Sequence, residues 1–165
     1  MARVRETSDA SEDESMLDLI PRWLPWAVFS LCLGGIAAAA YLFYAHLTDP
    51  AVLVCPENGA INCAKVTTSA QSRFIGIPVS FLGLAFFVVY AAINYPRFFA
   101  SRLLGMLRFL MAIGAMAFVL WLVYAELLIV NAICLWCSAV HVITLLSFLL
   151  VLYASIQTGV LRRTH

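Results

Sequence analysis

The chain has 165 residues, of which 64% are hydrophobic and only 12% are charged, and its formal net charge is +1. Soluble domains are apolar at roughly half of their positions, so a water-soluble fold of this composition would lack polar surface. The weak net charge and the scattered arginines exclude the clustered basic face of a nucleic-acid-binding protein.

The chain begins with a polar segment and continues with four apolar runs. Residues 6–18 are rich in Glu, Asp and Ser, which predicts a disordered cytoplasmic tail over residues 1–22. Each run approaches the ~20 residues that cross a bilayer core. The runs cover about residues 24–47, 78–95, 109–130 and 137–156. They predict an all-α integral membrane protein, a four-transmembrane-helix bundle over residues 23–157, followed by a short cytoplasmic tail at 158–165.

The distribution of basic residues predicts the orientation of this bundle. Cytoplasmic loops of membrane proteins carry an excess of Lys and Arg. Eight arginines fall on one side of the predicted spans, and only Lys65 and Arg73 fall on the other. The eight are Arg3, Arg5, Arg22, Arg97, Arg102, Arg108, Arg162 and Arg163. Both termini and the middle loop are therefore expected in the cytoplasm, with the other two loops outside.

The first external loop, at about residues 48–76, contains one pair of cysteines, Cys55 and Cys63. Asn58 and Gly59 form a turn signal between them, so the two sulfur atoms can meet. Asn62 is suited to cap a short helix that begins at Cys63. The pair is interpreted either as a structural disulfide of the loop or as a mobile redox pair.

A second pair, Cys134 and Cys137, forms a CxxC motif at the outer start of the last apolar run. Free backbone N–H groups and the helix dipole favour a thiolate at such a position. A static disulfide here would close a very small loop and add little stability. Two dithiols on the same side of a membrane favour a thiol–disulfide relay, since exchange requires contact between sulfur atoms.

Two other classes of protein also fit four external cysteines. The first is a non-enzymatic membrane scaffold whose disulfides are structural. The second is a zinc-handling protein with a Cys₄ site. A CxxC motif at the lipid boundary leaves little room for a tetrahedral site, so we expect no metal.

The order of these motifs resembles one family. A loop C-x7-C is followed by a Ser/Thr-rich segment, by Phe-Ile-Gly-Ile-Pro at residues 74–78, and by CxxC at the start of the last span. This order resembles the bacterial homologues of vitamin K epoxide reductase (VKOR) from about residue 24 to 153. Quinone-linked oxidases of the DsbB type carry the CxxC in the first external loop instead.

The resemblance implies a role for each cysteine. Cys55 matches the residue that exchanges with a soluble partner, and Cys63 the residue that attacks the membrane pair through a transient Cys63–Cys134 disulfide. Cys137 matches the cysteine beside the quinone. Many bacterial members carry a fused thioredoxin-like domain, whereas this sequence ends at His165 without one. A separate DsbA-like thioredoxin-fold protein is therefore the implied partner, and the bacterial inner membrane the implied location.

The implied cofactor is a quinone, either menaquinone or ubiquinone, and the resemblance does not exclude a quinone epoxide. His141 lies one helical turn after Cys137 on the same face, so it is a candidate for quinone binding or for a structural hydrogen bond. Ser80 on the second run is a further candidate. Glu126 and His46 are interpreted as interfacial residues, and Cys32 as a buried packing residue.

Overall fold

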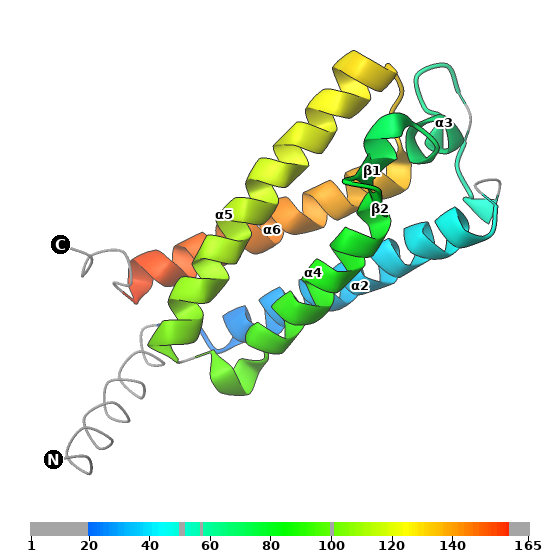
Figure 1. The fold of residues 1–165 in the computed structure, drawn as a ribbon. Coiled ribbons are helices and arrows are strands. Elements are labelled where there is room, and N and C mark those ends of the chain that lie inside the picture. The colour runs from blue at the N-terminus through cyan, green and yellow to red at the C-terminus, as the bar shows by residue number, and fades with distance from the viewer. Residues whose placement is uncertain (1–19, 50–51, 57, 100, 159–165) are drawn as a thin grey trace, which may run out of the picture.

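The structure is a computed structural model that describes residues 20–49, 52–56, 58–99 and 101–158. It is built from the long helices α2 (Trp23–Leu47), α4 (Val79–Ile93), α5 (Arg102–Tyr124) and α6 (Leu135–Gln157) (Figure 1). Helix α5 continues into a π-helical turn, η4 (Ala125–Val130). Three of these helical segments, α2, α5 with η4, and α6, are long and apolar enough to cross a membrane. The apolar helix α4 is shorter, with 15 residues.

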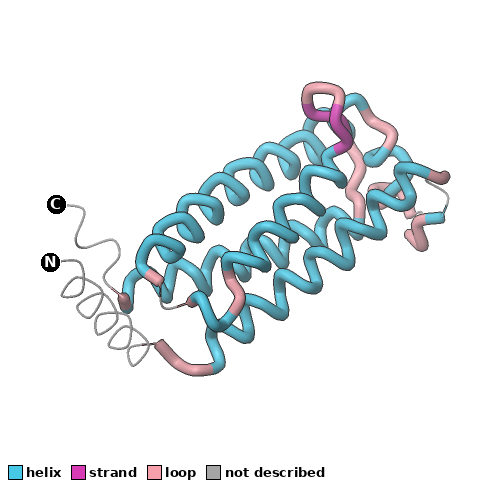
Figure 2. Tube along the Cα trace, turned by 60° about the horizontal axis from the view of Figure 1, so that its bottom comes forward, coloured by secondary structure: helices cyan, strands magenta, loops and turns pink. Residues whose placement is uncertain are grey.

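The long helices alternate in direction, which separates two kinds of connection. The start of α2, the end of α6 and the short turn η3 (Pro96–Phe98) between α4 and α5 lie at one end of the bundle (Figure 1). The opposite end carries α3 (Cys63–Thr67) and η2 (Ala70–Ser72). An antiparallel hairpin of β1 (Arg73–Phe74) and β2 (Ile77–Pro78) also lies there, as Figure 2 shows. Both cysteine pairs therefore belong to this second end.

Helices α2 and α4 pack closely in the interior. Gly35 faces the ring of Phe87, and a Cβ atom at this glycine would lie 2.7 Å from the ring carbon Cζ. Toward the η3 end, Leu24, Val28 and Cys32 of α2 are fully buried in one apolar cluster. The burial of Cys32 agrees with the packing role predicted for it.

At the η3 end, the helix that contains the third predicted span is longer than that span. Helix α5 begins at Arg102 rather than near residue 109, so Arg108 lies inside the helix and not in a loop. Arg108 is 3% exposed, with its guanidinium 4.0 Å from the centre of the Phe99 ring. Its Nη2 donates to the carbonyl of Ile93 at 3.2 Å. An arginine tolerates this burial because its planar head stacks on a ring while donating to free carbonyls.

The two predicted tails fall almost entirely outside the described residues. Of the segment 1–22, the structure describes 20–22, and there Ile20 is 6% exposed and packs into the same apolar cluster as Leu24. The ordered bundle therefore includes at least this residue of the predicted tail. Of the segment 158–165, only Thr158 is described.

Candidate active site

The loop that carries Cys55 and Cys63 is hydrogen-bonded to the residues that precede the CxxC motif. Ile61 and Ile133 form a parallel bridge. The backbone N–H of Asn62 donates to the carbonyl of Ile133 at 3.1 Å, and the N–H of Ile133 donates to the carbonyl of Ala60 at 2.8 Å. The bridge places residues two before Cys63 and one before Cys134 side by side.

A disulfide joins Cys55 and Cys63, whose Cα atoms are 6.2 Å apart. The turn at Gly59, with φ of 51°, reverses the chain between them, as the sequence predicted. Asn62 caps α3 through its side-chain oxygen, which accepts from the N–H of Lys65 at 2.8 Å. Cys63 is 1% exposed, whereas Cys55 is partly exposed. Cys55 is therefore the more accessible residue of this disulfide.

Two aromatic side chains hold the residues before Cys55. The hydroxyl of Tyr41 donates to the carbonyl of Val52 at 2.8 Å and accepts from the N–H of Val54 at 3.1 Å. The indole N–H of Trp136 donates to the carbonyl of Val54 at 3.1 Å. The rings of Tyr41 and Trp136 meet edge to face with centroids 4.7 Å apart. We name Tyr41 and Trp136 the aromatic clamp.

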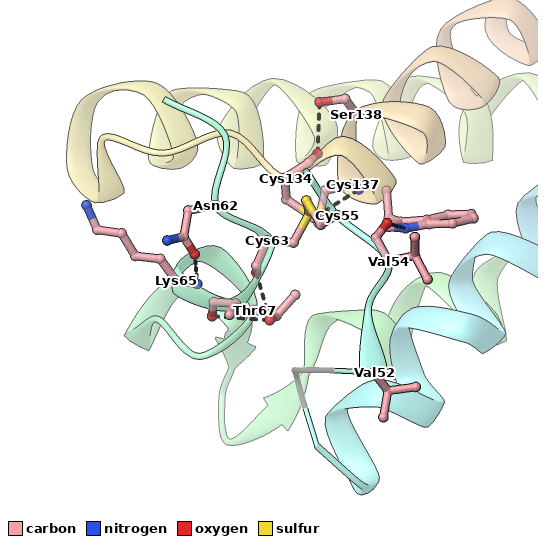
Figure 3. The surroundings of a disulfide bond; sticks show 12 residues. Val52, Val54, Cys55, Asn62, Cys63, Lys65, Thr67, Cys134, Cys137 and Ser138 are labelled. Carbon is pink, nitrogen blue, oxygen red and sulfur yellow. Dashed lines mark hydrogen bonds between the residues drawn. A yellow bond between two sulfur atoms is a disulfide. The ribbon is translucent and has the colours of Figure 1, made fainter. Parts of the chain in front are cut away.

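The CxxC motif forms the N-terminus of α6. Cys134 is the N-cap residue, and its sulfur accepts a hydrogen bond from the backbone N–H of Cys137 at 3.2 Å. Hydrogen bonds from the Cys137 thiol and from this N–H lower the pKa of Cys134 below the usual thiol value, although burial opposes them. Cys134 is fully buried and Cys137 is partly exposed. Figure 3 shows the Cys55–Cys63 bond beside these two free thiols.

All four cysteines share one apolar environment. Cys63 and Cys134 belong to the same buried cluster, against which Cys55 and Cys137 pack. The structure thus brings together two pairs that are separated by about 70 residues of sequence, as the relay hypothesis requires.

A cavity of about 540 Å³ opens among α2, α4, α5 and α6 at this end of the bundle. Its wall is mostly apolar and includes Cys137, His141 and Ser80. The hairpin covers part of it through Phe74, whose ring contacts that of Phe118 on α5 with centroids 5.7 Å apart. The two residues predicted for quinone binding therefore line one cavity together with the second cysteine of CxxC.

The interpretation of Glu126 as an interfacial charge is wrong. Glu126 is 7% exposed, in the π-helical turn η4, and lines the cavity. Its carboxylate interacts with the backbone of Cys134 and with the side chain of Cys137. An acidic residue in a membrane span is by default a functional candidate, and that signal was present in the sequence. His46, also interpreted as interfacial, lines the same cavity.

Within the described parts of the chain, no group of three His, Cys, Asp or Glu side chains is arranged to hold a metal ion. The chemistry available at this site is that of the sulfur atoms and of the acid and histidines beside them.

A bundle of apolar helices that holds a disulfide against a dithiol defines a membrane protein of thiol–disulfide chemistry. The family model of the vitamin K epoxide reductase family matches residues 26–152, and the chain belongs to this family. Its membership confirms the resemblance and makes the chain a membrane oxidoreductase. No curated protein sequence matches the chain.

Proposed function

We propose that the protein reoxidises a soluble thioredoxin-fold partner of the DsbA type and passes the electrons to a membrane quinone. It would thereby support disulfide formation outside the cytoplasm. The observation that carries this proposal is that the Cys55–Cys63 disulfide and the Cys134 and Cys137 thiols share one apolar cluster, and that Cys137 also lines an apolar cavity. A purely structural staple would not need a second dithiol beside it.

The first exchange would take place at Cys55. A thiolate of the reduced partner attacks the Cys55 sulfur, the Cys55–Cys63 bond breaks, and Cys63 leaves as a thiolate. The second partner thiol then attacks the mixed disulfide between the partner and Cys55, and Cys55 is released as a thiolate. The partner is now oxidised and the loop pair is reduced. The partial exposure of Cys55 and the burial of Cys63 support this order.

The second exchange would move the electrons to the membrane pair. The Cys63 thiolate attacks Cys134 of an oxidised Cys134–Cys137 pair, and Cys137 leaves. Cys55 then attacks Cys63 and displaces Cys134. Because a thiol of low pKa is a good leaving group, the lowered pKa of Cys134 favours this last step. The described state, with a loop disulfide and two free thiols, corresponds to its product.

The cavity supports a quinone as the acceptor. Ligand pockets usually measure about 300–1,000 Å³ and are mainly apolar with few polar groups. This cavity has about 540 Å³ and brings Cys137, His141 and Ser80 to its wall. A bound quinone supplies an acceptor for two electrons and two protons. Cys137 would face its ring, while His141 and Ser80 would donate hydrogen bonds to its carbonyl oxygens.

We further propose that all four long helices span a bacterial inner membrane, with both termini in the cytoplasm and the cysteines outside. Helix α4, with 15 residues, is about 22 Å long, which is less than the ~30 Å hydrocarbon core. The hairpin of β1 and β2 precedes α4 directly and would complete the crossing at the interface. Labelling of single cysteines at residues 65 and 97 with a membrane-impermeant reagent tests this topology, because only the first should react in intact cells.

The function is tested with purified protein, a reduced thioredoxin-fold donor and a short-chain quinone. We expect quinone reduction that depends on the donor and oxidises one donor dithiol per quinone. A protein whose cysteines do not exchange with the donor would be a scaffold with structural disulfides. Thiol–disulfide exchange with the donor in the absence of quinone reduction would support the cysteine relay but reject a quinone as its electron acceptor.

A further inference from the structure

Glu126 is a buried acid at the reacting sulfur atoms, and the cysteine relay assigns no task to it. Glu126 and Cys137 line the same cavity, and the carboxylate interacts with the Cys137 side chain, which in turn interacts with the sulfur of Cys134. Among the groups that interact with Glu126 in the described part of the chain, none is a basic side chain. A carboxylate paired with a thiol, rather than with an arginine or a lysine, can exchange a proton.

The backbone around Glu126 fixes this position. A π-helical turn carries it, and such turns are frequent at functional sites. Its carbonyl accepts a hydrogen bond from the N–H of Ala132 at 3.1 Å, and Asn131 ends the turn in the left-handed conformation with φ of 50°. These contacts direct the chain from η4 back to the CxxC motif, so the acid and the thiols are held by one short segment.

Oxidation of the membrane pair requires a route for protons. The Cys134 and Cys137 thiols lose two electrons and two protons as their S–S bond forms, and a quinone gains both as its two carbonyls become hydroxyls. The cavity wall is mostly apolar. A fixed acid–base group is therefore needed between sulfur and acceptor.

We propose that Glu126 is a catalytic residue that accepts the proton of the Cys137 thiol and delivers it to the acceptor in the cavity. The proton of Cys134 passes to the same carboxylate after the first proton has been delivered, so the carboxylate is ionised again at the end of the reaction. This inference rests on the proposed quinone-linked function. The other titratable groups on the cavity wall are His46 of α2 and His141 of α6.

The variant Glu126→Gln distinguishes a role of Glu126 in proton transfer from a purely structural role. The amide keeps the size of the side chain and an oxygen for the N–H of Cys134, but it does not carry a proton. Protein with an intact loop disulfide and reduced Cys134 and Cys137 is mixed with a short-chain quinone, and one turnover is followed by absorbance. We expect a loss of roughly a hundredfold or more at pH 7 in Glu126→Gln. Glu126→Asp should recover part of the rate.

Two further observations belong to this experiment. The rate in Glu126→Gln should rise with pH and approach that of the wild type, because hydroxide replaces the missing base. Exchange of the loop disulfide with the reduced donor should stay within about twofold of the wild type, which also reports that the variant is folded. Equal loss in both steps, or no loss in the quinone step, would overturn the proposal.

A measurement without quinone keeps the inference testable if the proposed function fails. In the Cys134→Ala background, alkylation of Cys137 is followed against pH by mass spectrometry, with and without Glu126→Gln. An ionised carboxylate repels a neighbouring thiolate, so its removal should shift the midpoint of alkylation downward by about one pH unit or more. An unchanged midpoint would reject proton coupling between Glu126 and Cys137. If the wild-type protein does not reduce quinone, only the proposed quinone acceptor is rejected, and the proton coupling between Glu126 and Cys137 is still tested by this measurement.

Discussion

Ile61 and Ile133 pair side by side in a parallel bridge, which ties the loop disulfide to the CxxC segment. The two backbone hydrogen bonds of this bridge, at 2.8 and 3.1 Å, involve no side chain. The bridge therefore sets the approach of Cys63 to Cys134 without depending on the chemistry of neighbouring side chains. Movement of the loop toward a soluble partner has to break the bridge or bend the chain between Asn62 and Cys55.

Replacement of either membrane-pair cysteine should stop electron flow. Cys134→Ala and Cys137→Ala each remove a sulfur without which the second disulfide cannot form. We expect oxidation of a thioredoxin-fold donor to fall to the uncatalysed rate in both variants, measured as loss of donor thiols in the presence of quinone.

Cys32→Ala is the matched control for these two variants. Cys32 is fully buried in the apolar cluster at the other end of the bundle and is a free thiol. Its replacement should retain donor oxidation and cost only about 1 kcal/mol of stability from the small cavity left behind. Normal donor oxidation in Cys134→Ala or Cys137→Ala would contradict the relay.

Cys55→Ala should trap the intermediate between the two pairs. Without Cys55, the Cys63 thiolate still attacks Cys134 of the oxidised pair, but no sulfur is left to displace Cys134. We expect a Cys63–Cys134 disulfide to accumulate, detected by mass spectrometry of peptides from unreduced protein. The double variant Cys55→Ala/Cys134→Ala should lack this species. A Cys63–Cys137 crosslink in its place would reverse the assignment of the two membrane cysteines.

The aromatic clamp should control local opening of the loop. Tyr41→Phe removes the hydroxyl that accepts from the N–H of Val54 and keeps the ring that packs on Trp136. Loss of one such bond costs about 0.5–1.5 kcal/mol, so exchange of the Val54 amide hydrogen should rise roughly two- to tenfold. Tyr44→Phe on the same helix, at a 55% exposed position, is the control and should leave this amide unchanged. An equal rise in both variants would mean that helix α2, and not the clamp, governs the opening.

The thiolate of Cys134 should persist to lower pH than an ordinary thiolate. Hydrogen bonds from the Cys137 thiol and N–H lower its pKa, so its charged form is retained as the pH falls. In a Cys32→Ala background with the loop disulfide intact, ultraviolet absorbance of the thiolate gives the midpoint. Cys137→Ala removes the thiol donor and should move this midpoint upward. A midpoint that stays constant would show that the Cys137 side chain does not stabilise the thiolate.

Much of this site followed from local sequence signals. The Asn58-Gly59 turn, the Asn62 cap and the CxxC motif at a helix start are short-range patterns, and each lies in the structure where it was predicted. His141 shares the cavity with Cys137 because both lie on one face of the same helix. Such features depend on neighbours within one turn, which a single sequence contains.

The features that the sequence did not predict depend on contacts between distant segments. Glu126 was interpreted as interfacial because it lies near the end of an apolar run. Its burial depends on a π-helical turn and on packing against the CxxC segment. Arg108 was assigned to a loop because the predicted third span begins at about residue 109. Its burial requires the Phe99 ring and the Ile93 carbonyl across a turn. Neither partner is apparent from local periodicity.

Gly35 should be required for the packing of α2 on α4, and therefore for the wall of the cavity. A methyl group at Gly35 would lie 2.7 Å from Cζ of Phe87, whose side chain is 1% exposed and also lines the cavity. Because the ring or the helix has to shift to make room for the methyl group, Gly35→Ala should cost about 1–3 kcal/mol, measured by denaturant unfolding in detergent. It should also slow quinone reduction more than exchange with the donor.

The neighbouring glycine provides a matched control for this substitution. At Gly34 an added Cβ atom would meet its nearest neighbour, Cδ1 of Ile143, at 3.7 Å, which is an ordinary contact. Gly34→Ala changes the helix propensity of α2 by the same amount as Gly35→Ala, so the difference between the two variants isolates the clash with Phe87. Equal stabilities would show that α2 and α4 can separate without cost. The ring of Phe87 would then not determine the shape of the cavity.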